Sequence, residues 1–306
     1  MLLDSASLYF RAYFGMPDSI TAPDGTPVNA VRGFVDMIAH LVTRWEPTHL
    51  VACWDDDWRP QWRVDAIPSY KAHRVVEVVP DGSDVEEVPD TLTPQVPVIA
   101  EVLAAVGIAR LGAPGCEADD VIGTLATRAV AAGVPHVDVV TGDRDLFQLV
   151  DDAHGVRILY TARGVRDLAE VNDAWLRDRY AIDGGARYAD LAVLRGDASD
   201  GLPGVAGIGE KTGAALLATH GDLVGLRAAV ASGDRRIPPG QRRKLVAAAD
   251  YLDVAPAVVN VLRDADLPAH DATLPRTPAD VDALADLADR WGIRTSINRL
   301  LAALPS

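Results

Sequence analysis

The sequence predicts an α/β protein whose core is a mostly parallel sheet flanked by helices. Short apolar runs of strand length recur at residues 2–4, 50–55, 137–143 and 156–160. Segments with apolar residues three and four positions apart, the spacing of a helix that buries one face, lie between them. Acidic residues follow most of the apolar runs. Alternating strands and helices favour a parallel sheet that is covered on both faces.

The first part of the chain predicts a strand, a helix, a second strand and an irregular segment. The helix at residues 28–45 has one apolar face, made by Val31, Phe34, Val35, Ile38, Leu41 and Val42. After the strand at residues 50–55, residues 58–74 mix aromatic and basic side chains. Residues 75–97 are rich in Pro, Asp, Glu and Val without a regular period. We expect a loop or arch there.

The remaining sequence predicts further alternation and then a helical region. Helical patterns occupy residues 97–106 and 118–132, a strand runs to residue 143, and a short helix at residues 145–150 precedes the strand at 156–160. Beyond about residue 183 the pattern is helical and rich in glycine, and the last ~40 residues look helical. We therefore expect a core at 1–182, with an arch region at about 58–97, and a helical region at 183–306.

Composition places the chain among globular proteins. It is 49% hydrophobic and 24% charged, and no apolar run approaches the ~20 residues of a membrane span. Nothing at the N-terminus reads as a signal peptide. Cys53 and Cys116 are the only cysteines, which favours free thiols in a reducing compartment. We expect a cytoplasmic protein with no membrane partner.

The formal charge of −15 argues against a nucleic-acid partner only if the acidity is spread evenly. Much of it is local, because residues 81–90 and several short acidic stations hold many of the carboxylates. Two basic groupings stand apart from them: Arg59, Arg63, Lys71 and Arg74, and then Arg235, Arg236, Arg242, Arg243 and Lys244. A surface divided by charge is therefore compatible with phosphate binding.

Nine carboxylates form the strongest chemical signal in the chain. They fall in six short stations, most of them just after an apolar run: Asp4, Asp55, Glu117, Asp119, Asp120, Asp143, Asp145, Asp197 and Asp200. Residues just past the carboxyl ends of parallel strands converge on one edge of a sheet. Carboxylates gathered there repel one another unless divalent cations neutralise them. Oxygen-only ligands favour Mg²⁺ or Mn²⁺, so we expect a divalent-metal site.

A glycine-rich segment at residues 202–212 predicts a loop that leads into a helix. Such a loop places backbone amides at a helix N-terminus, which suits contact with a phosphate. Near the N-terminus, Tyr9, Phe10, Tyr13 and Phe14 offer rings on which a terminal base can stack. Core packing is at least as good an interpretation of these four rings.

Taken as an ordered set, these motifs resemble the bacterial 5′ nuclease family. The matching segments are Asp4, Trp54-Asp55, Arg63, Tyr70-Lys71-Ala72-His73-Arg74, Glu117-Ala118-Asp119-Asp120, Thr141-Gly142-Asp143-Arg144-Asp145 and Gly196-Asp197-Ala198-Ser199-Asp200-Gly201-Leu202-Pro203-Gly204-Val205. This is the flap endonuclease and 5′-to-3′ exonuclease group, which includes stand-alone proteins and the N-terminal nuclease domain of DNA polymerase I. The resemblance covers about residues 1–249. We expect the chain to work without an attached polymerase domain.

The resemblance implies a PIN-like nuclease core that hydrolyses phosphodiesters of DNA carrying 5′ flaps, nicks, gaps or 5′ overhangs in replication and repair. It implies two divalent ions, one held by Asp4, Asp55, Glu117, Asp119 and Asp120 and the other by Asp143, Asp145, Asp197 and Asp200. Lys71 and Arg74 match a basic pair that neutralises charge on the scissile phosphate.

The resemblance also implies a helix-hairpin-helix-like DNA anchor at about residues 197–250, with a K⁺ ion at its loop. The implied DNA-binding residues are Arg63, Tyr70, Gly207, Gly209, Lys211 and Thr212. Contacts of this kind meet the phosphate backbone and read no base sequence. We expect a monomer.

The chain departs from the family pattern at several positions. Gly201 stands where the family usually has Asn, and Gly213 where Ala is common. Asp56 and Asp57 make the second acidic station more acidic than usual. Residues 75–97 are acidic where the arch is often basic, which leaves open whether a 5′ single strand threads through it.

Two other functions remain open on sequence grounds. One is a ribonuclease of the PIN class, which shares the acidic cluster but is usually shorter and lacks the loop at residues 204–212. The other is a structure-specific DNA-binding protein without catalysis, against which the complete carboxylate set argues.

Overall fold

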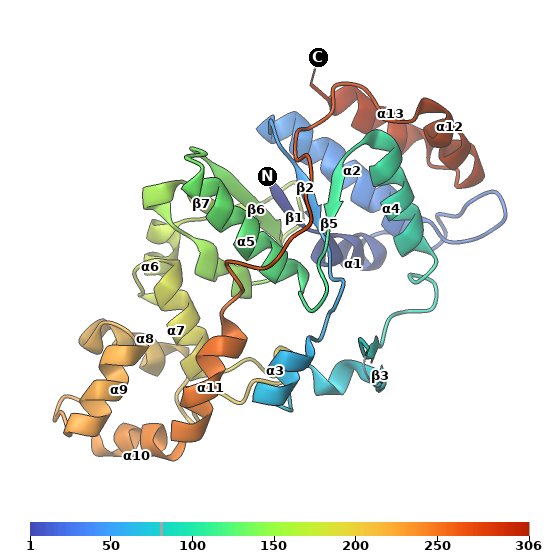
Figure 1. Cartoon of the computed structure of the whole chain (residues 1–306). Coiled ribbons are helices and arrows are strands. Elements are labelled where there is room, and N and C mark those ends of the chain that lie inside the picture. The colour runs from blue at the N-terminus through green and yellow to red at the C-terminus, as the bar shows by residue number, and fades with distance from the viewer. Residues whose placement is uncertain (80–81, 306) are drawn as a thin grey trace.

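The fold centres on a six-stranded sheet, seen in a computed structural model that describes residues 1–79 and 82–305 (Figure 1). The strand order is β5-β2-β1-β6-β7-β8. The strands are β1 (Leu2–Asp4), β2 (Val51–Cys53), β5 (Ala109–Leu111), β6 (Val137–Thr141), β7 (Val156–Tyr160) and β8 (Ala169–Val171). Only β8 pairs antiparallel with its neighbour, β7. The expected mostly parallel α/β sheet is confirmed.

Helices cover both faces of the sheet because successive strand residues point to opposite sides. Leu2, Val51 and Val139 belong to one buried cluster, and their chain neighbours Leu3, Ala52 and Val140 to the other. The second cluster contains α1 (Ser5–Gly15), α2 (Asn29–Trp45), α4 (Gln95–Val106), α12 (Val281–Arg290) and α13 (Arg294–Ala303). The first contains α5 (Ala118–Ala131).

The strand order reverses direction between β1 and β6. The chain passes outward from β1 to β2 and β5, and then returns to β6 on the other side of β1. Helices that leave the sheet on opposite faces open a crevice at such a switch point, at the carboxyl ends of the strands. This topology brings the end of β1 and the turn after β6 to one place.

The helical second region does not stay together in space. After α6 (Asp173–Tyr180), which still belongs to the expected core, this region continues the first cluster through α7 (Gly185–Arg195), α8 (Glu210–His220), α9 (Leu223–Ser232), α10 (Pro239–Ala247) and α11 (Ala249–Val259). The chain then returns to the sheet, where the amide of Leu50 donates to the carbonyl of Ala272 at 2.8 Å. Residues 261–280 contain no helix, so the expectation that the last ~40 residues are helical is met only by α12 and α13, which pack on the core beside α2 and α4 (Figure 1).

Within residues 1–79 and 82–305, no single helix has the length and apolar character of a membrane span. Among the described helices, only α8 and α9 taken together have the length and composition of a span, and a 79° bend separates them.

The arch region contains short pieces of structure and no long helix among its described residues. It holds α3 (Gln61–Ala66), a 3₁₀ turn at Ala72–Arg74, and a two-stranded hairpin made by β3 (Val75–Glu77) and β4 (Val85–Glu86). We call the described residues 75–79 and 82–87 the acidic hairpin. Asp81, part of the expected acidic segment, lies outside the described residues. A mixed composition of Pro, acidic and β-branched residues supports no helical face, which explains the hairpin.

Several element boundaries differ from the expected ones. The second and third strands end at Cys53 and Thr141, two residues before the acidic stations, and the segment at Asp145–Leu149 is a 3₁₀ helix. The sequence reading also missed α1, β5 and β8; the two strands have only three residues each, too few for a clear period. The helices expected at 28–45 and 118–132 are confirmed as α2 and α5. Both cysteines are free and buried.

Candidate active site

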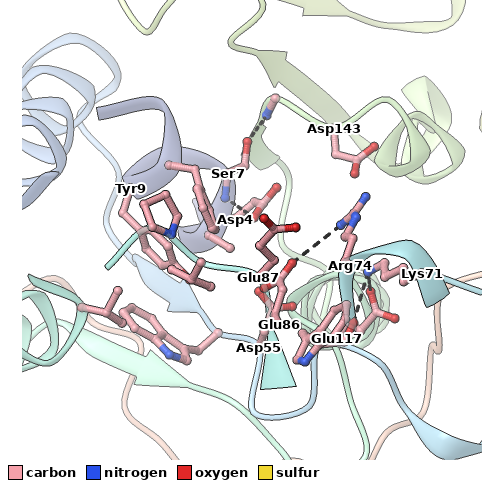
Figure 2. Close-up of a pocket in the computed structure, with 18 of the residues that line it drawn as sticks. Asp4, Ser7, Tyr9, Asp55, Lys71, Arg74, Glu86, Glu87, Glu117 and Asp143 are labelled. Carbon is pink, nitrogen blue, oxygen red and sulfur yellow. Dashed lines mark hydrogen bonds and ion pairs between the residues drawn. The ribbon is translucent and has the colours of Figure 1, made fainter. Parts of the chain in front are cut away.

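A cleft of about 1480 Å³ lies at the carboxyl ends of β1, β2 and β6, where the topology places the switch point. Six of the nine expected carboxylates line it: Asp4, Asp55, Glu117, Asp119, Asp143 and Asp197. Asp145 and Asp200 line a small adjoining cavity together with Glu117 and Asp119. Asp120 lines neither. Lys71 and Arg74 face the cleft from the other side, as Figure 2 shows.

Asp4 is held rigidly at the end of β1. Its side chain caps α1 by accepting from the Ser7 amide at 3.1 Å, and its second oxygen accepts from the Thr141 hydroxyl at 2.6 Å. The pKa of Asp4 is raised to about 7, mainly because the side chain is buried. The hydrogen bond from Thr141 lowers this pKa, and the negative charge of Asp55 raises it. Thr141 also accepts from the Asp143 amide at 2.8 Å, so one buried hydroxyl fixes two stations.

The neighbouring carboxylates raise one another's pKa. Burial and the charges of Asp143 and Asp4 hold the pKa of Asp119 well above its usual range. Burial and the charges of Asp143 and Asp200 do the same for Asp145. Groups with this arrangement favour a bound cation, which relieves both desolvation and repulsion.

The donor set fits Mg²⁺ or Mn²⁺, since every candidate ligand is a carboxylate oxygen. Among the described residues, no three His, Cys, Asp or Glu side chains are arranged to hold one ion directly. Mg²⁺ usually binds through one or two carboxylates and keeps several waters. The open cleft beside these carboxylates is therefore compatible with ions held partly through water.

Asp120 has a different place from the expected one. It is fully buried, and its two oxygens accept from both terminal nitrogens of Arg63 at 2.7 Å each, from the Leu262 amide at 2.9 Å and from the Glu117 amide at 3.2 Å. Four hydrogen bonds use all the lone-pair positions of a carboxylate, which leaves none for a metal. Asp120 thus completes a capping box with Glu117 at the start of α5.

Arg63 and Tyr70, expected to contact DNA, are also buried in this network. They are 3% and 4% exposed. Arg63 donates to Glu117 at 3.1 Å as well as to Asp120, and the Tyr70 hydroxyl donates to Glu117 at 2.6 Å. The geometry makes them supports of the site, because no polar atom of either is free to reach a phosphate without breaking a buried pair.

The basic pair is tied to the carboxylates. The Lys71 ammonium donates to Glu117 and, at 3.2 Å, to the Trp58 carbonyl. Burial, the largest single influence, lowers the pKa of Lys71, but the charges of Glu117, Tyr70 and Asp200 and the hydrogen bond to Glu117 together hold that pKa well above its usual range. Arg74 donates to Asp200 at 2.9 Å and to the Ser199 carbonyl at 2.7 Å. Its side chain is 34% exposed, so it remains accessible from the cleft.

Comparison with known proteins supports what this geometry indicates. The family described as "5'-3' exonuclease, N-terminal resolvase-like domain" matches residues 1–181, and "5'-3' exonuclease, C-terminal SAM fold" matches residues 184–282. The chain belongs to the 5'-3' exonuclease family. It is therefore a DNA nuclease of the 5′-to-3′ exonuclease and flap endonuclease group.

Several relatives extend along the whole chain. A 5'-3' exonuclease of Streptomyces coelicolor is 62% identical over 304 residues, which is 99% of each chain. One of Mycobacterium tuberculosis is 53% identical over 311 residues, covering 99% of this chain and 97% of its own. The DNA polymerase I of Mycobacterium tuberculosis is 36% identical over 305 residues, but they make up only 32% of that protein.

Solved structures share the fold at low identity. The T5 D15 protein co-crystallised with metal ions has a TM-score of 0.66 and 18% identity, with 99% of this chain and 98% of that one covered. The catalytic core of Rad2 in complex with DNA substrate has a TM-score of 0.62 and 19% identity, with 99% and 92% covered.

The glycine-rich loop of this nuclease enters α8 as expected. Gly207 has a φ of 72°, and the Lys244 ammonium donates to its carbonyl at 2.9 Å. Gly209 caps the N-terminus of α8, and Lys211 is exposed in the first turn, next to the half-buried Thr212. Backbone amides and one cation are thus presented at a helix N-terminus.

Gly201 connects the loop to the basic pair, a role that sequence reasoning missed. It has a φ of 69°, and a Cβ there would lie 2.0 Å from the Ser69 carbonyl oxygen. The Ser69 hydroxyl donates to the Gly201 carbonyl at 2.7 Å, and the Lys71 amide to the Asp200 carbonyl at 2.9 Å. Glycine at this position, where the family usually has Asn, therefore allows the backbone of residue 201 to lie close to that of Ser69 beside the site.

The sequence analysis assigns no role in the site to Ser7, Thr141, Glu86 or Glu87. The Ser7 hydroxyl accepts from the Gly142 amide at 2.8 Å and so fixes the turn after β6. Glu86 and Glu87 line the cleft from the acidic hairpin. Of the N-terminal aromatic residues, Tyr9, Phe10 and Phe14 line the cleft, and the side chain of Phe14 is 73% exposed.

Proposed function

We propose that this nuclease hydrolyses phosphodiesters at 5′ flaps, nicks, gaps and 5′ overhangs of DNA with the help of two divalent cations, Mg²⁺ or Mn²⁺. The observation that carries the proposal is the gathering of mutually repelling carboxylates, from the buried Asp4 and Glu117 to the exposed Asp143, in one open cleft opposite Lys71 and Arg74. Such a site combines cation binding with positive side chains that face the same space.

We assign the residue roles by resemblance to the 5'-3' exonuclease family. Asp4, Asp55 and Asp119 would hold one ion together with Glu117, while Asp143, Asp145, Asp197 and Asp200 would hold the other. When bound, the cations supply Lewis-acid polarisation of the phosphate and stabilise the leaving oxygen. Asp120, Arg63 and Tyr70 orient Glu117 and α5 from behind the cleft.

Lys71 and Arg74 stabilise the charge that develops on the phosphate. Both side chains lie against carboxylates that fix their positions before substrate arrives, and such preorganised donors act where charge builds up in the transition state. Bound cations would draw charge from Glu117 and Asp200 and so leave the two basic side chains more available to the phosphate.

DNA would be held away from the cleft by the loop that ends at Gly209. Its exposed backbone at Gly207, with Lys211 and Thr212, suits a duplex phosphate and a K⁺ ion, so shape rather than sequence would guide binding. We interpret residues 1–182 as the nuclease core and 183–306 as the part that carries this anchor at about 197–250. We propose that the nuclease acts as a monomer.

The test is cleavage of a 5′-labelled duplex that carries a 5′ flap, with Mg²⁺, with Mn²⁺ and with chelator, beside the Asp143→Asn variant. Metal-dependent cuts near the junction that disappear in the variant are expected. Cleavage of single-stranded RNA alone would instead support a PIN-type ribonuclease. Binding of branched DNA without any cut under either metal would overturn the catalytic proposal.

A further inference from the structure

The acidic hairpin is fastened across one side of the cleft. Asp84 accepts from Arg59 at 2.5 Å and from the Val79 amide at 3.2 Å, and its carbonyl accepts from the Trp58 indole at 2.6 Å. The Arg59 and Asp84 side chains are only 8% and 10% exposed. The Glu87 amide donates to the Arg74 carbonyl at 2.8 Å. The hairpin is therefore a fixed wall, held on both sides of β4.

Two carboxylates of this wall, Glu86 and Glu87, point into the cleft. Glu86 lies 4.0 Å from Arg74, and Figure 2 shows Glu86 and Glu87 between Asp4 on one side and Arg74 on the other. Glu87 forms no ion pair within the described part of the chain. Neither residue belongs to the nine carboxylates of the proposed metal site, so bound cations do not account for these two charges.

Neither α1 nor the described part of residues 76–97 contributes a Lys or Arg to the cleft lining. We call α1 together with residues 76–79 and 82–97 the outer wall of the cleft. Its described lining residues include Tyr9, Phe10 and Phe14 from α1, and none of them is Lys or Arg. The positive residues that line the cleft are Lys71, Arg74 and Arg144, and Arg74 lies 4.0 Å from Glu86.

A single strand that runs out past the outer wall brings one phosphate per nucleotide close to Glu86 and Glu87. Like charges within a Debye length, about 8 Å at physiological salt, repel. The phosphates of a strand of one or two nucleotides would lie near Lys71 and Arg74, whose positive charges offset that of Glu86. The further phosphates of a longer strand would pass the outer wall, where no described lining residue is positive.

We propose that Glu86 and Glu87 are specificity-determining residues that make this nuclease prefer recessed 5′ ends and very short 5′ flaps over long ones. This inference rests on the proposed function. It assigns the acidic hairpin the opposite effect from a basic arch that would attract a 5′ single strand. The aromatic side of the outer wall still provides stacking surface for the terminal bases of a short strand.

The test measures kcat/KM on flaps of one, about five and about twenty nucleotides for the wild type and for the E86Q/E87Q double variant. We expect the ratio of long-flap to one-nucleotide-flap cleavage to rise about five- to tenfold in the double variant. In the wild type this ratio should also rise between about 50 and 200 mM salt, because screening weakens the repulsion, and it should change little in the variant.

Two controls separate the charge effect from its alternatives. The D282N/D286N variant removes the same charge from α12, outside the cleft lining, and should keep the wild-type ratio. The single variant E87Q removes a carboxylate without releasing Arg74 and should give part of the rise.

The outcomes are distinguishable. A uniform increase on every flap length would show only the release of Arg74 from Glu86 and would overturn the length preference. An unchanged ratio in E86Q/E87Q would also overturn it, while one-nucleotide cleavage would leave the proposed function standing. Failure to cut any of these substrates would instead count against the proposed function itself.

Discussion

Replacing Asp120 with Asn should damage folding more than metal binding, although Asp120 lies within an acidic motif of the site. Asn keeps the shape but removes the charge that two Arg63 nitrogens contact at 2.7 Å, and its amide group would face these donors. Breaking a buried ion pair costs about 3–5 kcal/mol. Since Arg63 keeps its contact with Glu117, we expect about 3 kcal/mol, or roughly 6 °C at about 2 °C per kcal/mol for a chain of this size.

The assay compares thermal unfolding and Mn²⁺ titration of Asp120→Asn with those of Asp143→Asn. Asp143 is exposed and accepts from one backbone amide, that of Asp145, so its replacement should change the unfolding temperature little and weaken Mn²⁺ binding strongly. Asp120→Asn should show the reverse. An Asp120→Asn protein with wild-type unfolding and no Mn²⁺ binding would identify Asp120 as a direct ligand and so contradict its structural role.

Three further results are expected. Arg74→Met should lower kcat about 10²-fold, as loss of one preorganised donor does, while Arg74→Lys retains part of the rate; equal rates in single-turnover assays would exclude this role. Saturating Mn²⁺, at about 100 times its Kd, should stabilise the protein by about 2.7 kcal/mol in calorimetry, reversibly with chelator, because it relieves the carboxylate repulsion; no shift would argue against a preformed site. Gly201→Ala should lower the free energy of unfolding in denaturant by about 2 kcal/mol, because residue 201 has a φ of 69° and a Cβ there would meet Ser69. Gly240→Ala, in α10 with open space around it, should stabilise the protein slightly. Similar effects of the two changes would contradict the close approach of Gly201 to Ser69.

The sheet and the location of the site could be predicted because both depend on local pattern. Apolar runs followed by acidic residues identify strand ends, and the parallel topology then brings those ends together. Thus Asp4, Asp55 and Asp143 were placed at the cleft from the sequence, and the structure puts them there. The apolar residues just before each of these carboxylates are enough to predict its place at a strand end.

The direction of individual side chains could not be predicted in the same way. Asp119 and Asp120 are adjacent on α5, yet one faces the cleft and the other faces Arg63, which comes from a separate helix. Only the packing of α3 against α11 and the start of α5 distinguishes them. The three-residue spacing of Glu117 and Asp120 does suggest a capping box, which is the one local signal of an inward role for Asp120.

The acidic hairpin could not be predicted for a related reason. Its strands have three and two residues, too short for a period, and its place depends on a buried pair between Arg59 and Asp84, which are 25 positions apart. The charge of residues 75–97 was visible in the sequence. Its direction, with Glu86 and Glu87 turned into the cleft, is a tertiary property.

The most direct test of the carboxylate site is a crystal structure of the wild-type protein soaked with Mn²⁺, using anomalous scattering to locate the ions. The proposal predicts Mn²⁺ peaks inside the cleft, beside Asp4, Asp119 and Asp143, with Asp120 still paired to Arg63. The same soak of the Asp143→Asn variant should lose at least one peak. Absence of any peak in the cleft of the wild type, or a peak that displaces Arg63 from Asp120, would contradict the account.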